Sequence, residues 1–110
     1  MKIEIQSPGF NASRDLLDYT MSNVEPLVAL SNRVLGVKVC LKIDKSATRE
    51  NKVCELRLEI PGNDLFSSRK SQSFQQSVKR ACESVTRQMI KWLESQDYGK
   101  QRGMKVATQT

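Results

Sequence analysis

The chain has 110 residues, 38% of them hydrophobic and 27% charged, which is the composition of one soluble domain with a single core. The formal net charge is +6, and a one-sided positive field favours a polyanion such as nucleic acid as the partner. Histidine is absent, and so are the G-x-S-x-G, P-loop and G-x-G-x-x-G patterns, so we expect no enzyme, no cofactor and no small-molecule substrate. No apolar run approaches the length of a membrane span and the start "MKIEIQSPGF" lacks a signal-peptide core, which predicts a cytoplasmic protein without membrane contact.

The cysteines Cys40, Cys54 and Cys82 are odd in number and lack the paired spacing of zinc sites or disulfide frameworks. Two of them fall where the patterns below predict burial, and a buried thiol behaves as a small apolar side chain. We interpret the cysteines as structural or incidental, with a redox role as the minor alternative and no metal site.

Alternating apolar residues predict a first strand over residues 2–7, ended by "SPGF". Ser13 is the predicted N-cap of a first helix. The apolar face of this helix has spacings of four, four and three residues: Leu16, Thr20, Val24 and Leu27. Pro26 lies inside the pattern, so the helix should kink or end within a turn of it.

Two alternating runs, 37–44 and 54–60, predict an antiparallel hairpin with one apolar face and one face of charges that pair across the strands. The turn signal "PGND" follows, and "LFSSRKS" (65–71) predicts a fourth, shorter strand. The predicted fold class is therefore α+β with the order β-α-β-β-β-α, a four-stranded sheet with two helices packed on one face.

The last helix is predicted to be strongly polarised. At about 100° per residue its apolar side chains share one sector: Phe74, Val78, Cys82, Val85, Met89 and Trp92. Arg80, Arg87 and Lys91 fall within about 20° of a line on the opposite side. Ser84 would fill the gap between the two arginines, and Lys79 lies about 100° from the line and widens the basic surface. We call Lys79, Arg80, Arg87 and Lys91 the basic ridge.

The charge is distributed unevenly along the chain. Residues 1–64 hold nine Lys/Arg and nine Asp/Glu, whereas residues 65–110 hold nine Lys/Arg and three Asp/Glu, so the second part carries the whole excess. Residues 97–110 show no apolar periodicity, which predicts a flexible basic tail after a single domain over residues 1–96.

Two interpretations of the basic ridge remain open from the residues alone. The ridge could contact successive phosphates of a structured RNA, or it could be a merely solvated helix back. The basic strand before the helix and the basic tail after it favour polyanion contact. Paired strand aromatics are missing, which favours recognition of backbone and shape, and Trp92 is assigned to the core edge.

The segment "ENKVCELRLEIPGNDLFSSRKSQSFQQSVKRACESVTRQMIKW" (50–92) resembles the ribosome hibernation-promoting factors, also called ribosome-associated inhibitors or sigma-factor modulation proteins, in their short form. It is similar in the strand that ends in Pro-Gly, in the "LFSS" start of the next strand and in the end of the last helix (85–91). The resemblance spans residues 1 to about 95, and its specific motifs lie in the second half.

The resemblance implies a non-catalytic protein that binds rRNA of the small ribosomal subunit in the mRNA/tRNA channel. It would act as a translation inhibitor that stabilises idle ribosomes in the stress response, most simply as a monomer. The RNA-binding residues that it implies are Lys79, Arg80, Arg87, Lys91, Arg69, Lys70 and Arg14.

The sequence also departs from the family pattern. Ser73, Phe74 and Gln75 replace an acidic residue followed by Met-Tyr at the start of the last helix, and the first helix offers chiefly Arg14. The alternative is therefore a protein–protein interaction module of the same fold that has lost strong rRNA binding. Generic double-stranded RNA binding is disfavoured because "SQSFQQ" is not basic and the histidine of that module is missing.

Overall fold

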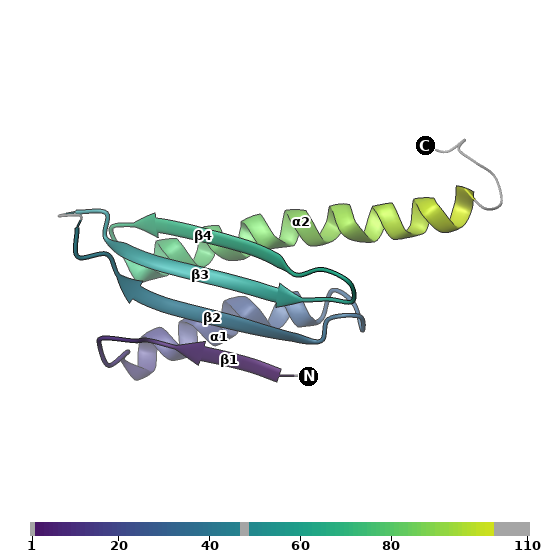
Figure 1. Ribbon diagram of the computed structural model, residues 1–110. Coiled ribbons are helices and arrows are strands. Elements are labelled where there is room, and N and C mark those ends of the chain that lie inside the picture. The colour runs from purple at the N-terminus through teal and green to yellow at the C-terminus, as the bar shows by residue number, and fades with distance from the viewer. Residues whose placement is uncertain (1, 47–48, 103–110) are drawn as a thin grey trace.

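The computed structural model describes residues 2–46 and 49–102, with side chains described as far as Gln96. The element order is β-α-β-β-β-α, which confirms the predicted fold class (Figure 1). The elements are β1 (Lys2–Gln6), α1 (Arg14–Val28), β2 (Gly36–Ile43), β3 (Lys52–Glu59), β4 (Leu65–Ser71) and α2 (Phe74–Arg102).

The four strands form one mixed sheet in the order β1-β2-β3-β4. β1 pairs with β2 in parallel through the α1 crossover, and the pairs β2–β3 and β3–β4 are antiparallel. Gly62 makes the turn after β3 with a φ of +87°, a left-handed conformation that favours glycine. Both helices lie behind the same face of the sheet and both begin at the end where β1 and β4 finish (Figure 1).

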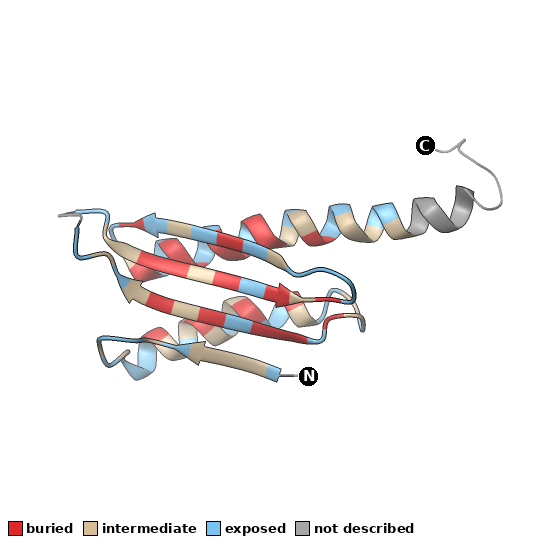
Figure 2. Ribbon diagram, in the orientation of Figure 1, coloured by how far each residue is buried: buried red, intermediate tan, exposed pale blue. Residues whose placement is uncertain are grey.

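The core lies between this face and the two helices, and the buried stripes in Figure 2 alternate along the central strands. The predicted face of α1 supplies Thr20, Val24 and Leu27 to it. The predicted faces of β2, β3 and α2 supply further fully enclosed side chains: Val37, Val39, Leu41, Cys54, Leu56, Leu58, Val78, Val85 and Met89. Phe10, in the loop before α1, stacks on Phe74 with ring centroids 5.0 Å apart and ties the starts of the two helices together.

The limits of α1 follow the sequence signals. The Ser13 hydroxyl accepts a hydrogen bond from the Leu16 amide at 3.1 Å, which confirms the N-cap. The helix ends at Val28, two residues after Pro26, so the prediction of an end within a turn of the proline is confirmed.

The structure extends α2 beyond the predicted start of the tail. Its backbone stays helical to Arg102, although we expected the tail to begin at residue 97. The last turns project past the sheet (Figure 1), so no core-facing stripe is required there and no periodicity marks them in the sequence. The remainder of the predicted tail, residues 103–110, lies outside the described residues, and the domain limits remain a prediction.

Side chains make hydrogen bonds to backbone groups of Phe66 and Ser68 on the unpaired edge of β4. The Gln88 side chain of α2 donates from Nε2 to the Phe66 carbonyl at 2.9 Å, and its Oε1 accepts from the Phe66 amide at 3.3 Å. The Arg69 guanidinium donates to the Ser68 carbonyl at 3.2 Å. The Gln88 amide thus replaces a peptide group of a neighbouring strand, and it fixes the rotation of α2 against the sheet.

Replacing Gln88 with Ala should lower the free energy of unfolding by about 1–2 kcal/mol, because the edge of β4 loses two partly exposed hydrogen bonds. Urea denaturation followed by circular dichroism measures the change. The matched control is Gln75→Ala, since Gln75 is an exposed glutamine on the same helix. Equal stability of the two variants would contradict this role of Gln88.

Candidate nucleic-acid interface

The basic ridge lies on the solvent side of α2. Lys79, Arg80, Arg87 and Lys91 are all exposed, while Val78, Val85 and Met89 on the opposite side are 0% exposed. Over the part of the chain with described side chains, no ion pair and no side-chain hydrogen bond engages any of the four cations. Within this part of the chain no direct ion pair therefore neutralises these cations.

Ser84 departs from its predicted place within the ridge. It is 7% exposed, although it was expected to fill the gap between Arg80 and Arg87. At about 100° per residue it is displaced about 40° from the line of Arg80, Arg87 and Lys91 toward Gln88, whose side chain reaches to β4 with Nε2 3.4 Å from the Ser84 hydroxyl. The surface between the two arginines is therefore not open at Ser84.

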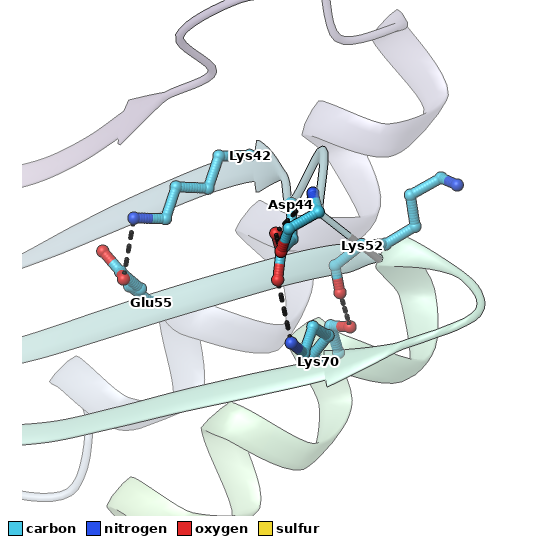
Figure 3. Close-up of polar contacts among 7 residues, drawn as sticks. Lys42, Asp44, Lys52, Glu55 and Lys70 are labelled. Carbon is cyan, nitrogen blue, oxygen red and sulfur yellow. Dashed lines mark hydrogen bonds and ion pairs between the residues drawn. The ribbon is translucent and has the colours of Figure 1, made fainter. Parts of the chain in front are cut away.

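The outer face of the sheet, away from the helices, has a different electrostatic character. Its cations are matched to acids of the neighbouring strands and turns, as the alternating pattern predicted: Lys38–Glu59 at 3.5 Å, Lys42–Glu55 at 3.0 Å, Arg57–Asp64 at 3.5 Å and Lys70–Asp44 at 2.9 Å. Figure 3 shows the second and fourth of these pairs. Exposed pairs of this kind stabilise by about 0–1 kcal/mol each, but they neutralise the face.

The register of β4 separates two of the predicted RNA-binding residues. Lys70 is paired with Val53 and points to the outer face, whereas Arg69 is paired with Cys54 and lies on the helix side of the sheet. Successive residues of a strand point to opposite faces, so the two cannot act together. The structure therefore does not bring Lys70 together with the basic ridge.

Arg14 lies at the first residue of α1 and is exposed. Both helices begin at the same end of the sheet, so Arg14 is at the end of the helix layer where Lys79 and Arg80 also lie (Figure 1). The rest of the solvent side of α1 is more acidic than basic, with Asp15, Asp18 and Glu25 exposed. The positive surface is consequently concentrated on α2.

Asp44 holds Lys70 on the outer face. Its Oδ1 accepts from the Ser46 hydroxyl at 2.6 Å and from the Ser46 amide at 3.0 Å, and its Oδ2 accepts from Lys70 Nζ at 2.9 Å. The Ser46 hydroxyl, then the Lys70 ammonium, hold the pKa of Asp44 well below its usual range. The carboxylate therefore stays charged, and Lys70 stays paired, throughout the neutral and mildly acidic range.

The cysteines are placed as predicted from the patterns. Cys54 and Cys82 are buried and Cys40 is half-buried on the outer face. Burial, and next the Glu83 carboxylate, raise the pKa of the Cys82 thiol to about 11, and burial raises the pKa of Cys54 and Cys40. The thiols are therefore protonated at neutral pH.

No metal site or membrane span is found in the described part. Among the described side chains of residues 2–46 and 49–96, no group of three or more Cys, Asp or Glu is arranged to hold a metal ion. None of the helices in these ranges is both long enough and apolar enough to cross a bilayer.

A groove between the two helices adds residues that the sequence patterns did not single out as a site. It has a volume of about 610 Å³ and is lined by Asn23 of α1 and by Lys79, Cys82, Glu83, Thr86 and Arg87 of α2. The one available signal was Glu83, the single acid among the residues of "SVKRACESVTRQMIKW". Asn23 stands at a position of the first helix that the family resemblance marks as often basic, but only the packing of α1 beside α2 places it in this groove.

A mixed four-stranded sheet with two helices on one face, one of them carrying unpaired cations, defines a small α+β protein with a candidate polyanion-binding helix. The family described as sigma 54 modulation protein / S30EA ribosomal protein has a model that matches residues 3–96. The match covers most of the chain, so the chain belongs to this family, as the sequence resemblance indicated. No curated protein matches the chain in sequence.

Two solved structures are similar in fold. One is described as a ribosomal subunit interface protein from Coxiella burnetii, with a TM-score of 0.75 and 16% identity over 86% of this chain and 99% of that chain. The other is the N-terminal domain of Protein Y from Thermus thermophilus, with a TM-score of 0.71 and 16% identity over 84% of this chain and 99% of that chain. At this level of identity the likeness concerns the fold alone.

Replacing Ser46 or Lys70 with Ala should raise the pKa of Asp44, and Ser46→Ala should raise it more, because the Ser46 hydroxyl is the larger cause. A carboxyl whose pKa is lowered by folding contributes stability above its unfolded pKa of about 3.9, and this contribution is lost as the pH falls through the folded value. Carboxyl-carbon NMR shifts during an acid titration measure the pKa.

Lys38→Ala is the control for this titration, since Lys38 pairs with Glu59 on the same face and should leave Asp44 unchanged. An Asp44 that titrates at its ordinary value in the unsubstituted protein would contradict its hydrogen bonds to Ser46 and Lys70.

Proposed function

We propose that this chain is a non-catalytic ribosome-binding protein that contacts rRNA of the small subunit through the basic ridge. It occupies the mRNA/tRNA channel, inhibits translation and stabilises idle ribosomes under stress or slow growth, acting as a monomer in the cytoplasm. Support comes from the family, whose description includes a ribosomal protein, and from the similar structure described as a ribosomal subunit interface protein.

The observation that carries the proposal is the contrast between the two faces of the molecule. Four cations of the outer sheet face are paired with acids, whereas the four cations of the basic ridge have no ion pair in the described part of the chain. A cation that is already paired gains little from a phosphate, because it must first give up its acid. An unpaired cation has no acid to give up, so phosphate binding is more favourable at the cations of α2 than at those of the outer sheet face.

The geometry of α2 suits the phosphate backbone of a folded RNA. Arg80 and Arg87 lie about two turns apart, at roughly 10 Å along the axis, and each guanidinium can donate two parallel hydrogen bonds to one phosphate. Lys91 continues the row by one further turn, and Lys79 broadens it toward α1. The contacts of these cations are to the phosphate backbone, so the row itself senses the shape and charge of the RNA.

The alternative, a protein–protein interaction module, is favoured by one observation. Phe66 is 43% exposed on the outer face, beside a cavity of about 250 Å³ that also involves Arg57 and Cys40. The guanidinium carbon of Arg57 lies 5.2 Å from the centre of the Phe66 ring, so Arg57 covers part of this apolar surface. We rank this second because a neutral, internally paired face offers a partner few unsatisfied groups.

Changing Arg80, Arg87 and Lys91 together to Ala should abolish co-sedimentation of the purified protein with small ribosomal subunits. The three side chains are exposed and face away from the core, so the fold should survive, as circular dichroism would verify. The matched control changes Lys38, Lys42 and Lys70 to Ala, which removes the same charge from the outer face and should leave co-sedimentation intact.

The pattern of the two triple variants separates the alternatives. Equal loss of binding in both would show that net charge matters and the basic ridge does not. A wild-type chain that stays in solution while it captures a protein partner through the outer face would favour the interaction module.

The affinity for small subunits should fall steeply as the salt concentration rises, because each phosphate contact releases counterions. Four contacts predict a slope of about −3 for the logarithm of the association constant against the logarithm of salt concentration. In a partially weakened variant, Arg87→Ala, the slope should become shallower by about 0.7–0.9. A binding constant that is independent of salt would contradict phosphate contact.

A further inference from the structure

The groove between α1 and α2 holds four polar side chains with unused capacity. Lys79, Glu83 and Arg87 follow one another at four-residue spacing on consecutive turns of α2, and all three are exposed. None of the three has an ion pair or a side-chain hydrogen bond in the described ranges. Asn23, from α1, donates its amide to the Tyr19 carbonyl at 2.9 Å, and its own carbonyl oxygen has no partner among the described groups.

The floor and the size of the groove limit what it can hold. Cys82 is 7% exposed, and Thr86 is half-buried with its hydroxyl donated to the Cys82 carbonyl at 2.7 Å, so the floor is weakly polar. The volume of about 610 Å³ lies within the usual range for small-ligand sites, roughly 300–1,000 Å³, and is large enough for one nucleotide.

The position of Glu83 is unexpected on a surface that binds phosphates only. A carboxylate between two cations on successive turns repels a phosphate and weakens the field of both neighbours. Its four-residue spacing from Lys79 and from Arg87 supports the helix, since opposite charges at this spacing attract, but toward a phosphate its charge is unfavourable. With a ligand that offers hydrogen-bond donors, the same carboxylate becomes an acceptor of high strength, because one partner is charged.

We propose that the groove binds one unpaired guanosine nucleotide of an RNA, with Glu83 reading the base and Lys79 and Arg87 holding the phosphates on its two sides. The inference rests on the proposed function and deepens it by naming the nucleotide class that the α2 surface selects.

Guanine is the base whose Watson–Crick edge fits a carboxylate. Its N1–H and N2–H groups point the same way and can donate to the two oxygens of Glu83. Adenine and cytosine place a ring acceptor beside their amino group, and uracil flanks its single N–H with two carbonyl oxygens, so each would set an acceptor against the carboxylate. The free oxygen of Asn23 and the weakly polar floor then contact the remainder of the nucleotide.

The test compares two RNA hairpins that differ in one loop nucleotide, an unpaired guanosine in one and inosine in the other. Inosine lacks the N2 amino group, so it loses one of the two donors to Glu83 and keeps every phosphate. Fluorescence anisotropy with the full chain should give binding to the guanosine hairpin that is roughly fivefold tighter than to the inosine hairpin.

Glu83→Gln should reduce this ratio to about one, because the amide presents a donor where the carboxylate presented an acceptor. The control is Glu94→Gln, which removes the same charge from an exposed position of α2 outside the groove and should keep the ratio. Lys79→Ala should weaken both hairpins equally and also keep the ratio.

The outcomes distinguish this inference from the proposed function. A wild-type ratio near one, or a Glu83→Gln variant that binds both hairpins more tightly by the same factor, overturns the guanosine site, and Glu83 then acts by repulsion alone. If the protein in that case still sediments with small subunits, the proposed function stands. If it neither sediments with subunits nor binds either hairpin at low salt, both proposals fail.

Discussion

Both helices of this protein bury their apolar stripes against the same face of one four-stranded sheet, and this constraint determines where every charged side chain lies. Residues on the outer face of β2, β3 and β4 have only each other as neighbours, so opposite charges are placed across the strands and pair there. Within the described residues no element faces the solvent side of α2, so the cations of the basic ridge remain without ion pairs. The sequence of α2 holds six Lys/Arg against three Asp/Glu, which is half of the net charge of +6.

The parts of the fold that depend on a period in the sequence were predictable, and those that depend on contacts between elements were not. Alternation in β2 and β3 and the helical period of α2 predicted the core residues, since burial imposes both periods. Lys70 was expected among the RNA-binding residues because the family resemblance implied it and because it belongs to the basic strand before the last helix. Only the register with Val53 shows that it points to the other face.

The same distinction applies to the candidate site. Helical geometry placed Arg80, Arg87 and Lys91 on the solvent side, and the structure agrees. Ser84 is buried at 7% exposure because its angle, about 40° from the line of these three residues, turns it toward the side of α2 from which Gln88 contacts β4. The groove includes Asn23, which lies beside α2 because α1 packs there. The sequence pattern of one helix does not show which residues of another helix lie next to it.

The contact between Gln88 and Phe66 has a further consequence for binding. Because both polar atoms of the Gln88 amide are held by the backbone of β4, α2 cannot roll or slide along the sheet without breaking two hydrogen bonds and exposing its apolar stripe. The cations on the other side of α2 are therefore held at a fixed spacing, because the position of the helix on the sheet is constrained. When a polyanion docks, the backbone of α2 has little conformational freedom left to lose, so within the protein the conformational entropy cost falls on the side-chain rotamers of the cations.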